Sequence, residues 1–291
     1  MKKVIITGAN GQDGIILSKL LIKKKYLVYK FVKKKKTNKK NYFVTSNKKF
    51  EEIEKKLNEI KPDIIVHLGS DNPSYKKKFL FLDYKKNLFF TKKLIDYVTN
   101  NNHIKLILIS SSKIFKKNKK KITENSPILI NDNYTKFRIK SAQYLFIKKR
   151  KFKLNATVLI LFNHDSRYRN PRFLLPRLIK AIKNNNVNFI KKIYNEEIIG
   201  DFSHAEDICN GIYLLIKKDK NPDKLILSSG KKTYINKIIR LFYKKIKNIK
   251  PNNKIKSQNN IIGNNQLARK TIGWKLKKNI IIAAKEIYKN Y

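Results

Sequence analysis

Short apolar runs alternate with amphipathic segments through the N-terminal half of the chain. Buried strands are predicted where branched apolar residues form short continuous runs, at Val4–Thr7, Leu27–Val32, Ile64–Leu68, Leu106–Ile109 and Thr157–Phe162. Between these runs, apolar residues recur at helical spacing and predict helices at 15–22, 47–60, 87–98 and 134–148. Strands that alternate with helices are typical of βαβ units, so the pattern predicts an α/β protein with a doubly wound parallel sheet.

The pattern changes after Asn163, where prolines at 171, 176, 222 and 251 separate shorter elements of mixed character. We therefore expect residues 1–162 to form the main sheet domain, with residues 204–229 returning to it. Residues 163–203 and 230–291 would form a smaller α/β portion above the carboxyl edge of the sheet.

Composition limits where such a protein can work. Hydrophobic residues make up 41% of the 291, which is enough for a large core and too many for a disordered basic tail. No apolar run approaches the roughly 20 residues that span a bilayer, and the short apolar stretch after Met1 does not fit a secretory signal. A single cysteine, Cys209, excludes an internal disulfide and fits a reducing compartment. We expect a soluble, cytoplasmic protein with no membrane partner.

The charge raises the question of a nucleic-acid partner. Lys and Arg number 69 against 20 Asp and Glu, which gives a formal net charge of +49. Only eight of the basic residues are arginine, and asparagine and isoleucine are over-used together with lysine, as an AT-rich genome would produce. Because specific readers of phosphates and bases favour the arginine fork, we interpret the lysine runs at 33–36, 76–78 and 119–121 as solvated surface. Nucleic acid stays the weaker alternative, although the positive field would attract any anionic small molecule.

A glycine-rich loop follows the first predicted strand directly. It reads Thr7-Gly8-Ala9-Asn10-Gly11-Gln12-Asp13-Gly14, opens the first helix and holds three of the chain's nine glycines. Gly8 allows the sharp exit from the strand, Gly11 lets backbone approach a pyrophosphate, and Gly14 lets the helix pack on the strand. The phosphates would then lie at the positive end of the helix dipole. The loop therefore predicts a dinucleotide cofactor.

The end of the second predicted strand bears on which dinucleotide is bound. The strand ends Phe31-Val32-Lys33-Lys34 and offers no Asp or Glu. An acidic residue there would hydrogen-bond the 2′-hydroxyl of NAD, whereas basic residues favour the 2′-phosphate of NADP. We therefore expect NADP as the cofactor, with Lys33 beside the phosphate, and keep NAD as the alternative.

Several motifs resemble the extended short-chain dehydrogenase/reductases, the NAD-dependent epimerase/dehydratase family. The resemblance is carried by the glycine spacing and by the segments Asp63–Gly69, Asn87–Thr91 and Asn264–Trp274. Within the family, Gly11–Gly14, Leu161–Ser166 and Asp201–Asp207 are most similar to the GDP-mannose 4,6-dehydratases. The resemblance implies a Rossmann-type sheet that binds NADP and a C-terminal α/β portion that binds substrate. It implies cofactor contacts from Gly8, Asn10, Gly11, Gln12, Asp13, Gly14, Lys33, Leu68 and Gly69.

The resemblance also implies a catalytic pair on one helix. The family uses a tyrosine and a lysine four residues apart, because residues i and i+4 share a helix face and the cation stabilises the tyrosinate that takes a proton from a sugar hydroxyl. The matching residues are Tyr134 and Arg138, and Ser111 matches the serine or threonine that positions the reacting oxygen. Asn163 and Arg177 match residues that contact the sugar nucleotide, Arg177 at its diphosphate.

Three positions depart from the family pattern. Arg138 stands where lysine is usual, Lys113 where dehydratases carry the glutamate of the elimination step, and Gly200 where an arginine commonly contacts substrate. Arginine keeps the charge in a different geometry, and a lysine serves as a base only when its pKa is strongly lowered. We therefore expect weakened activity, with dehydration the step most affected. Four histidines and one cysteine give no ligand set for zinc, so no metal site is expected.

Three functions remain open on these residues. The leading prediction is an NADP-dependent enzyme of the GDP-mannose 4,6-dehydratase type, which oxidises C4 of the hexose, removes water and returns the hydride, for deoxysugar and surface polysaccharide synthesis. A 4-keto-sugar nucleotide reductase or an epimerase keeps only the redox step and needs no glutamate at position 113. A catalytically impaired dinucleotide-binding partner protein is the third. The resemblance also implies a GDP-mannose-like sugar nucleotide as substrate and a homodimer or homotetramer formed through helices 87–98 and 134–148.

Overall fold

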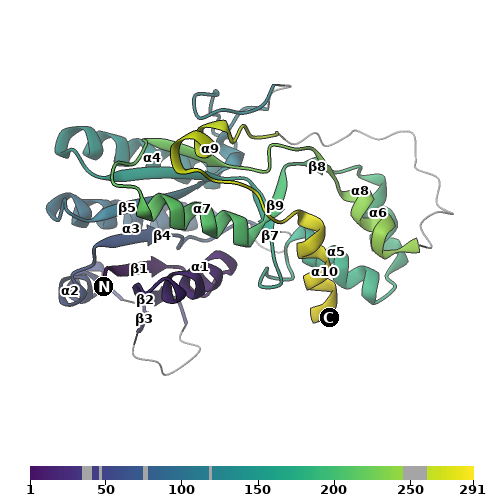
Figure 1. Cartoon of the computed structure of the whole chain (residues 1–291), viewed down its shortest axis with the longest axis horizontal. Helices are drawn as coiled ribbons and strands as arrows, with labels where there is room; N and C mark the ends of the chain where they lie inside the picture. Colours follow the sequence, from purple (N-terminus) through teal and green to yellow (C-terminus); the bar gives the residue numbers. More distant parts are fainter. Residues whose placement is uncertain (35–40, 46–47, 75–77, 118–119, 245–260) are drawn as a thin grey trace.

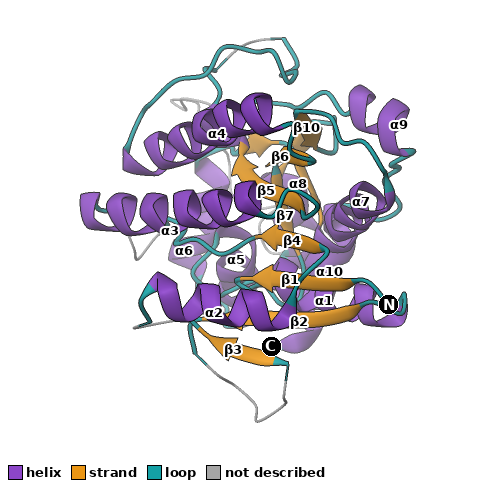
Figure 2. Ribbon diagram, turned by 90° about the vertical axis from the view of Figure 1, so that its left-hand side faces the viewer, coloured by secondary structure: helices purple, strands orange, loops and turns teal. Residues whose placement is uncertain are grey.

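A computed structural model describes residues 1–34, 41–45, 48–74, 78–117, 120–244 and 261–291. Their main feature is a sheet built from β1 (Lys3–Thr7), β2 (Leu27–Val32), β3 (Tyr42–Val44), β4 (Ile64–His67), β5 (Lys105–Ser111), β6 (Ala156–Leu161) and β10 (Lys224–Leu227). The strands lie in the order β10-β6-β5-β4-β1-β2-β3, and every neighbouring pair is parallel (Figure 2). The predicted α/β class with a doubly wound parallel sheet is confirmed.

Helices cover both faces of this sheet (Figure 2). One face carries α1 (Gln12–Lys23), α7 (Ala205–Lys217) and α9 (Gln266–Ile272), and the other α2 (Phe50–Ile60), α3 (Phe81–Asn100) and α4 (Asn133–Phe152). Strand side chains alternate between the two cores, since Val4 and Ile6 of β1 pack towards α1 and Ile5 packs towards α2 and α3. Burial on both faces is why these strands read as continuous apolar runs.

Most predicted elements lie where the hydrophobic pattern predicts them. β2 has the predicted bounds, whereas α1 begins earlier, inside the glycine loop, and α3 begins at Phe81 rather than Asn87. β3 was missed, because three half-buried residues at a sheet edge carry little periodicity. The predicted start of the second helix at Asn47 lies outside the described residues, as do Pro251 and much of the predicted lysine runs (35, 36, 76, 77 and 119).

The strand order reverses between β1 and β4, at the middle of the sheet. β1 pairs with β2 on one side and with β4 on the other. The loops that leave β1 and β4 at the carboxyl edge therefore lead to helices on opposite faces, and open α/β sheets bind ligands in the crevice between such loops.

A smaller portion lies beyond the carboxyl edge of the sheet (right side of Figure 1). Its own core comes from α5 (Leu174–Lys183), α6 (Val187–Asn195), α8 (Ile235–Phe242) and α10 (Ile280–Asn290). It also holds two short strand pairs: β7 (Asn163–Asp165) runs parallel to β9 (Phe202–His204), and β8 (Ile199–Gly200) runs antiparallel to β11 (Thr233–Tyr234). The chain returns to the main sheet through α7 and β10, which pairs with β6. The exact residue boundaries of the two portions stay a prediction.

The C-terminal segment is fastened to α7 through Trp274. This side chain is fully buried, and its indole N–H donates to the Asp207 carbonyl oxygen at 2.8 Å. The Asp207 carboxylate accepts the backbone N–H groups of Lys277 and Lys278. Within the described ranges, none of the helices combines the length and apolar character needed to cross a bilayer.

Candidate active site

The glycine loop leaves β1 tightly and passes close to the loop after β4. Gly8 has a φ of +69°, and a Cβ added there would lie 2.8 Å from Gly69 Cα. A Cβ on Gly14 would lie 2.5 Å from Ala9 Cα, whereas on Gly11 its nearest neighbour would be the Gly8 carbonyl oxygen at 3.3 Å. The contacts at Gly8 and Gly14 leave no room for a side chain. The two loops therefore meet through backbone atoms at the switch point, the place between β1 and β4 where the strand order reverses.

Hydrogen bonds through a buried histidine hold these two loops together. Thr91 donates its hydroxyl to a backbone carbonyl one turn earlier in α3, so the Thr91 oxygen accepts from His67 Nε2 at 3.0 Å. His67 Nδ1 then accepts from the Thr7 hydroxyl at 2.7 Å, and Thr7 Oγ1 accepts the Gly69 N–H at 2.9 Å. Burial, helped by the positive charge of Arg138, lowers the pKa of His67 to about 3, which keeps this neutral tautomer.

Gln12 and Asp13 point their side chains at β7 and the turn beyond it. Gln12 Nε2 donates to the His164 carbonyl oxygen at 3.2 Å, and Gln12 Oε1 accepts from the Ser166 hydroxyl at 3.0 Å. His164 Nε2 lies 3.0 Å from both carboxylate oxygens of Asp13, and His164 Nδ1 lies 2.7 Å from the Phe162 carbonyl oxygen. Both side chains therefore bind the glycine loop to the smaller portion; their predicted part in cofactor binding stays a prediction.

The Asp13–His164 pair is buried, and each partner favours the charged form of the other. Burial alone would lower the pKa of His164, but the Asp13 carboxylate raises it above its ordinary value. Burial alone would raise the pKa of Asp13, but the His164 charge and its hydrogen bond lower it. Both ring nitrogens face acceptors, which fits a protonated imidazolium.

A cavity of about 420 Å³ opens at the carboxyl edge beside these loops. The predicted site residues that line it are Asp13, Leu68, Ser111, Tyr134, Arg138, Asn163 and Arg177. The remaining predicted cofactor residues lie outside its lining: Gly8, Asn10, Gly11, Gln12, Gly14, Lys33 and Gly69. All the residues predicted for catalysis and substrate binding thus come together from β5, α4, β7 and α5.

Tyr134 and Arg138 share one buried face of α4. Each is 5% exposed, and the Arg138 guanidinium carbon lies 5.1 Å from the centre of the Tyr134 ring. Phe79 packs edge-on against that ring, with 5.4 Å between the ring centres. Because residues four apart lie on one helix face, the guanidinium keeps a positive charge beside the phenol ring.

The Arg138 guanidinium is bound mainly to the protein itself. Nη1 donates to the Ile109 carbonyl oxygen at 2.7 Å, and Nη2 donates to Ser70 Oγ at 2.6 Å and Asn72 Oδ1 at 3.3 Å. One fork therefore bridges the end of β5 and the loop after β4. A lysine ammonium is a single point of charge and could not reproduce this set of contacts from the same position.

Ser111 ends β5 and caps the short 3₁₀ helix η1 (Ser112–Ile114). Its Oγ accepts the backbone N–H of Lys113 at 3.3 Å. The neighbouring Ser110 also lines the cavity, and its buried hydroxyl has no hydrogen-bond partner in the described ranges. The Lys113 ammonium lies 5.9 Å from the centre of the Tyr134 ring.

Arginines form one wall of the cavity, and the sequence reasoning found only one of them. Arg169, Arg172 and Arg177 all line it; Arg169 lies 3.1 Å from the Asp165 carboxylate and packs on a phenylalanine ring. With Arg138, four of the chain's eight arginines line one cavity. Four of the eight arginines also lie within residues 167–177, a clustering along the sequence that could have identified Arg169 and Arg172. Gly200, where the family carries an arginine, lies outside the lining.

The predicted phosphate-binding lysine lies at the edge of the switch point. Lys33 Nζ forms an ion pair with Asp71, at 2.8 and 2.9 Å from the two carboxylate oxygens, and its side chain is 67% exposed. Asn10 Nδ2 donates to the Lys34 carbonyl oxygen at 2.7 Å, which ties the glycine loop to the end of β2. An exposed ion pair of this kind is weak enough for a ligand phosphate to compete with Asp71.

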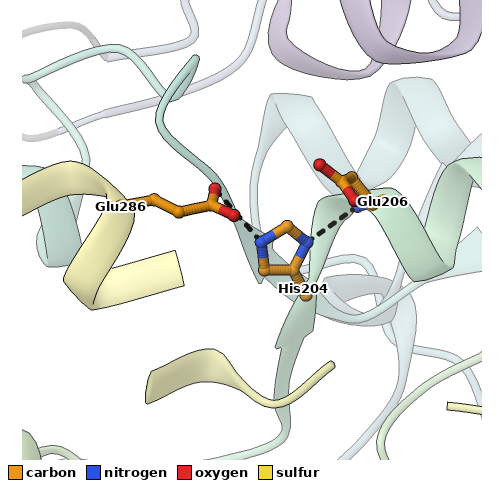
Figure 3. A group of neighbouring side chains, drawn as sticks. All are labelled: His204, Glu206 and Glu286. Carbon is orange, nitrogen blue, oxygen red and sulfur yellow. Dashed lines mark hydrogen bonds and ion pairs between the residues drawn. The ribbon is translucent and has the colours of Figure 1, made fainter. Parts of the chain in front are cut away.

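A second cluster of titratable groups lies where β9 meets α7 and α10 (Figure 3). His204, Glu206 and Glu286 offer ligand atoms within 4.8 Å of one another. However, His204 Nδ1 accepts the backbone N–H of Glu206 at 3.1 Å, so the proton of a neutral ring is on Nε2, which faces Glu286 at 3.3 Å. Lys278 also lies 2.6 Å from Glu206. This tautomer leaves no lone pair for a metal ion, so we interpret the cluster as a helix cap with ion pairs; the absence of a metal site stays a prediction.

The residues at the switch point fit a dinucleotide. Gly11 is the N-cap of α1 and no side chain caps that helix, so its first N–H groups face the loop without a side-chain acceptor. At Gly8 and Gly14, the glycine loop, which is the cradle for the dinucleotide phosphates, is free of side chains. In the adjoining cavity, the Ser110 hydroxyl and Arg138 Nε are buried without hydrogen-bond partners in the described chain, as expected of groups that a ligand would contact.

Comparisons with known proteins bear on the family and on the fold. A family model described as GDP-mannose 4,6 dehydratase matches residues 5–286. GDP-mannose 4,6 dehydratase 1 of Arabidopsis thaliana is 23% identical over 259 residues, which are 80% of this chain and 72% of that protein. The fold is similar to that of a dTDP-glucose 4,6-dehydratase from Bacillus anthracis in complex with NAD, with a TM-score of 0.81, 14% identity and coverage of 99% of this chain and 96% of that one. A UDP-glucose 4-epimerase from Thermotoga maritima gives a TM-score of 0.81 at 17% identity, with coverage of 99% and 98%.

Proposed function

We propose that this chain, which belongs to the GDP-mannose 4,6 dehydratase family, oxidises and reduces the sugar of a nucleotide sugar with a nicotinamide dinucleotide. One observation carries the proposal. The side-chain-free glycine cradle and the Tyr134–Arg138 pair lie at the same carboxyl edge of the sheet, where a dinucleotide and a second ligand can meet.

Each residue at this edge has a part in the proposed chemistry. A bound nicotinamide dinucleotide supplies the acceptor and donor of hydride. The backbone of the glycine loop, with Leu68 and Gly69, would hold it. Tyr134 takes the proton from the sugar hydroxyl beside the positive charge of Arg138, and Ser111 orients the reacting oxygen. Asn163 and Arg177 would contact the nucleotide sugar, Arg177 through its diphosphate.

The dehydration step distinguishes the two candidate reactions. The full GDP-mannose 4,6-dehydratase reaction removes water after oxidation at C4 and needs a general base for that step. Among the described residues that line the cavity, Asp13 is the only carboxylate, and both its oxygens face His164. This favours the second candidate, a 4-keto-sugar nucleotide reductase or an epimerase, which needs only Tyr134 as acid and base.

We propose NADP rather than NAD as the cofactor. The support is that Lys33 and Lys34 follow β2, where a carboxylate would repel a 2′-phosphate. The dissociation constants for NADP and NAD should differ at least tenfold in the wild type. Lys33→Glu should reverse that order, whereas Lys30→Glu, on the same strand, should leave it unchanged. Equal affinities in the wild type would contradict the proposal.

We further propose a homodimer or homotetramer that uses α3 and α4. The two helices lie side by side on one face of the sheet (Figure 2). Phe81, Phe89 and Ile147 on these helices are 52%, 58% and 57% exposed, which leaves apolar area for a second copy to cover.

The decisive experiment mixes the purified protein with NADP and GDP-mannose and seeks the 4-keto-6-deoxy product by mass spectrometry. Product that depends on Tyr134 supports the dehydratase: it should vanish in Tyr134→Phe and persist in Tyr144→Phe, a control on the same helix outside the cavity. Turnover only with a supplied 4-keto sugar and NADPH supports the reductase. Interconversion of two sugar nucleotides supports the epimerase. Tight dinucleotide binding without any of these reactions would overturn the enzymatic proposal in favour of a catalytically impaired partner protein.

A further inference from the structure

The cavity has an excess of positive charge that a diphosphate alone does not balance. Besides His164, five of its described lining side chains are basic: Lys113, Arg138, Arg169, Arg172 and Arg177. Asp13 is the only carboxylate among them, and its charge is directed at the His164 imidazole. A ligand bound here therefore experiences a strongly positive environment.

The basic groups divide into three sets. Arg169, Arg172 and Arg177 come from one stretch of chain, and planar guanidinium forks suit the oxygens of a diphosphate. Arg138 is buried and bound to the end of β5 and to the loop after β4. Lys113 belongs to neither of these. It lies on η1, far from the arginine segment in the sequence, and its ammonium is close to the Tyr134 ring.

Lys113 faces the cavity with an unpaired charge. Its backbone is fixed by the N–H bond to Ser111, and its ammonium is 5.9 Å from the centre of the Tyr134 ring. In the part of the chain that the structure describes, no carboxylate lies within ion-pair distance of this ammonium. An anionic group held beside the phenol would complete the pair, whereas a neutral sugar would leave the charge facing solvent.

Resting on the proposed function, we propose that the preferred substrate is a nucleoside-diphosphate sugar whose ring carries a carboxylate, with Lys113 as its counter-ion. The ring hydroxyl that reacts lies at Tyr134, and a carboxylate elsewhere on the same small ring stays within reach of the flexible lysine stem. Such a ligand carries two negative charges on its diphosphate and a third on its carboxylate, and the positive cavity can bind all three. Lys113 is thus a specificity-determining residue.

The test compares two pairs of ligands that differ only at C6: UDP-glucose with UDP-glucuronate, and GDP-mannose with GDP-mannuronate. Calorimetric titration of the full chain, loaded with the dinucleotide, gives the four dissociation constants. In at least one pair the uronate should bind at least tenfold more tightly. Lys113→Gln should remove that preference, and Lys113→Glu should reverse it. Lys116→Gln, an exposed lysine outside the cavity lining, should leave the preference intact.

The outcomes separate this inference from the function on which it rests. If the neutral sugars bind as tightly as the uronates, or the preference survives in Lys113→Gln, the inference is wrong and the proposed function stands. If the dinucleotide binds but none of the four sugar nucleotides does, both are overturned. If Lys116→Gln lowers the preference as much as Lys113→Gln, the effect belongs to the general field of the chain and the inference is again wrong.

Discussion

At the scale of single residues, arginine is the informative basic side chain in this protein. Lysine is so frequent that its presence at one position of the sequence says little without its contacts in the structure, whereas four of only eight arginines line one cavity. Arg138 shows why the distinction matters. Its fork joins Ile109 at the end of β5 to Ser70 and Asn72 after β4, so the arginine has a structural task that a lysine in the same place would not have.

Because Arg138 supplies both a charge and a set of hydrogen bonds, Arg138→Lys should affect stability more than the hydride-transfer rate. The ammonium keeps a positive charge beside Tyr134, so the hydride-transfer rate should stay within about tenfold of the wild type. Loss of the fork should lower the free energy of unfolding by about 1–3 kcal/mol, because a buried carbonyl and two polar side chains lose their donor. Urea unfolding and single-turnover kinetics measure the two effects separately. Arg138→Met is the matched comparison, because it removes both the charge and the fork. Its hydride-transfer rate and its free energy of unfolding should both fall, and equal rates in the two variants would contradict a role for the charge.

The glycine loop gives a second prediction at this scale. Gly14→Ala places a methyl group 2.5 Å from Ala9 Cα, so the backbone must move, and the free energy of unfolding should fall by about 1–3 kcal/mol. Dinucleotide affinity should fall more than tenfold in a thermal-shift titration, because the cradle is displaced. Gly273→Ala is the control: unlike Gly14, Gly273 has a positive φ, and no atom lies within 4 Å of a Cβ added there, so the variant should destabilise the protein through its backbone without changing that affinity.

At the scale of elements, the joint between α1 and β7 holds the two portions of the molecule together. Gln12 and Asp13 belong to the first turn of α1, and their partners His164 and Ser166 belong to β7 and the turn beyond it. The glycine-loop motif therefore has a second role, because its Gln12 and Asp13 side chains also hold the first residues of the smaller portion in place. The charge on this joint makes its contribution to stability dependent on pH.

The predicted pH dependence follows from the directions of the two shifts. The pKa of His164 is raised above its ordinary value of about 6.5, so its stabilisation is complete below that pH and is lost as pH rises through the raised value. The pKa of Asp13 is lowered, so its stabilisation is present above about pH 3.9 and is lost as pH falls through the lowered value. The difference in free energy of unfolding between wild type and His164→Gln should therefore be larger at pH 5.5 than at pH 9.

The control for this measurement is His103→Gln, which changes an exposed histidine outside the joint. His67 acts in the opposite sense on the absolute curve: its pKa of about 3 means that the unfolded chain takes up a proton first, and stability falls as pH drops below about 6.5. Because His67 is present in both proteins, it cancels in the difference. A wild-type-minus-variant difference that is the same at both pH values would show that the pair is not charged.

The sequence predicts the elements of the main sheet well and the smaller portion poorly, for physical reasons. Strands buried on both faces read as continuous apolar runs, and the glycine loop has a backbone requirement that few residues meet. β3 and the two-residue strands β8 and β11 depend on partners distant in sequence, so periodicity cannot find them. The site shows the same division. The family resemblance implies Ser111, Tyr134 and Arg138, whereas the contacts of Arg138 with Ser70 and Asn72 arise only when α4 meets the loop after β4.

At the scale of the whole molecule, a net charge of +49 opposes self-association, because like charges repel across any interface between two copies. An apolar face must therefore supply the attraction in the proposed oligomer. Phe81, Phe89 and Ile147 on α3 and α4 are exposed apolar side chains that a second copy could cover, and the repulsion between copies is screened as ionic strength rises. Association should thus strengthen with added salt, the reverse of the behaviour expected for a complex with nucleic acid.

The final prediction tests that face by substitution. Phe89→Asp places a carboxylate at a side chain that is 58% exposed, and a charge buried in an apolar interface is strongly unfavourable. Its dimer dissociation constant in sedimentation equilibrium should rise more than tenfold, with an unchanged circular dichroism spectrum. Ile22→Asp on α1 has similar exposure, 54%, and adds the same charge elsewhere, so it should leave the dissociation constant within about twofold. Equal weakening by both variants would assign the effect to net charge, and a wild-type protein that stays monomeric at every salt concentration would remove α3 and α4 as the interface.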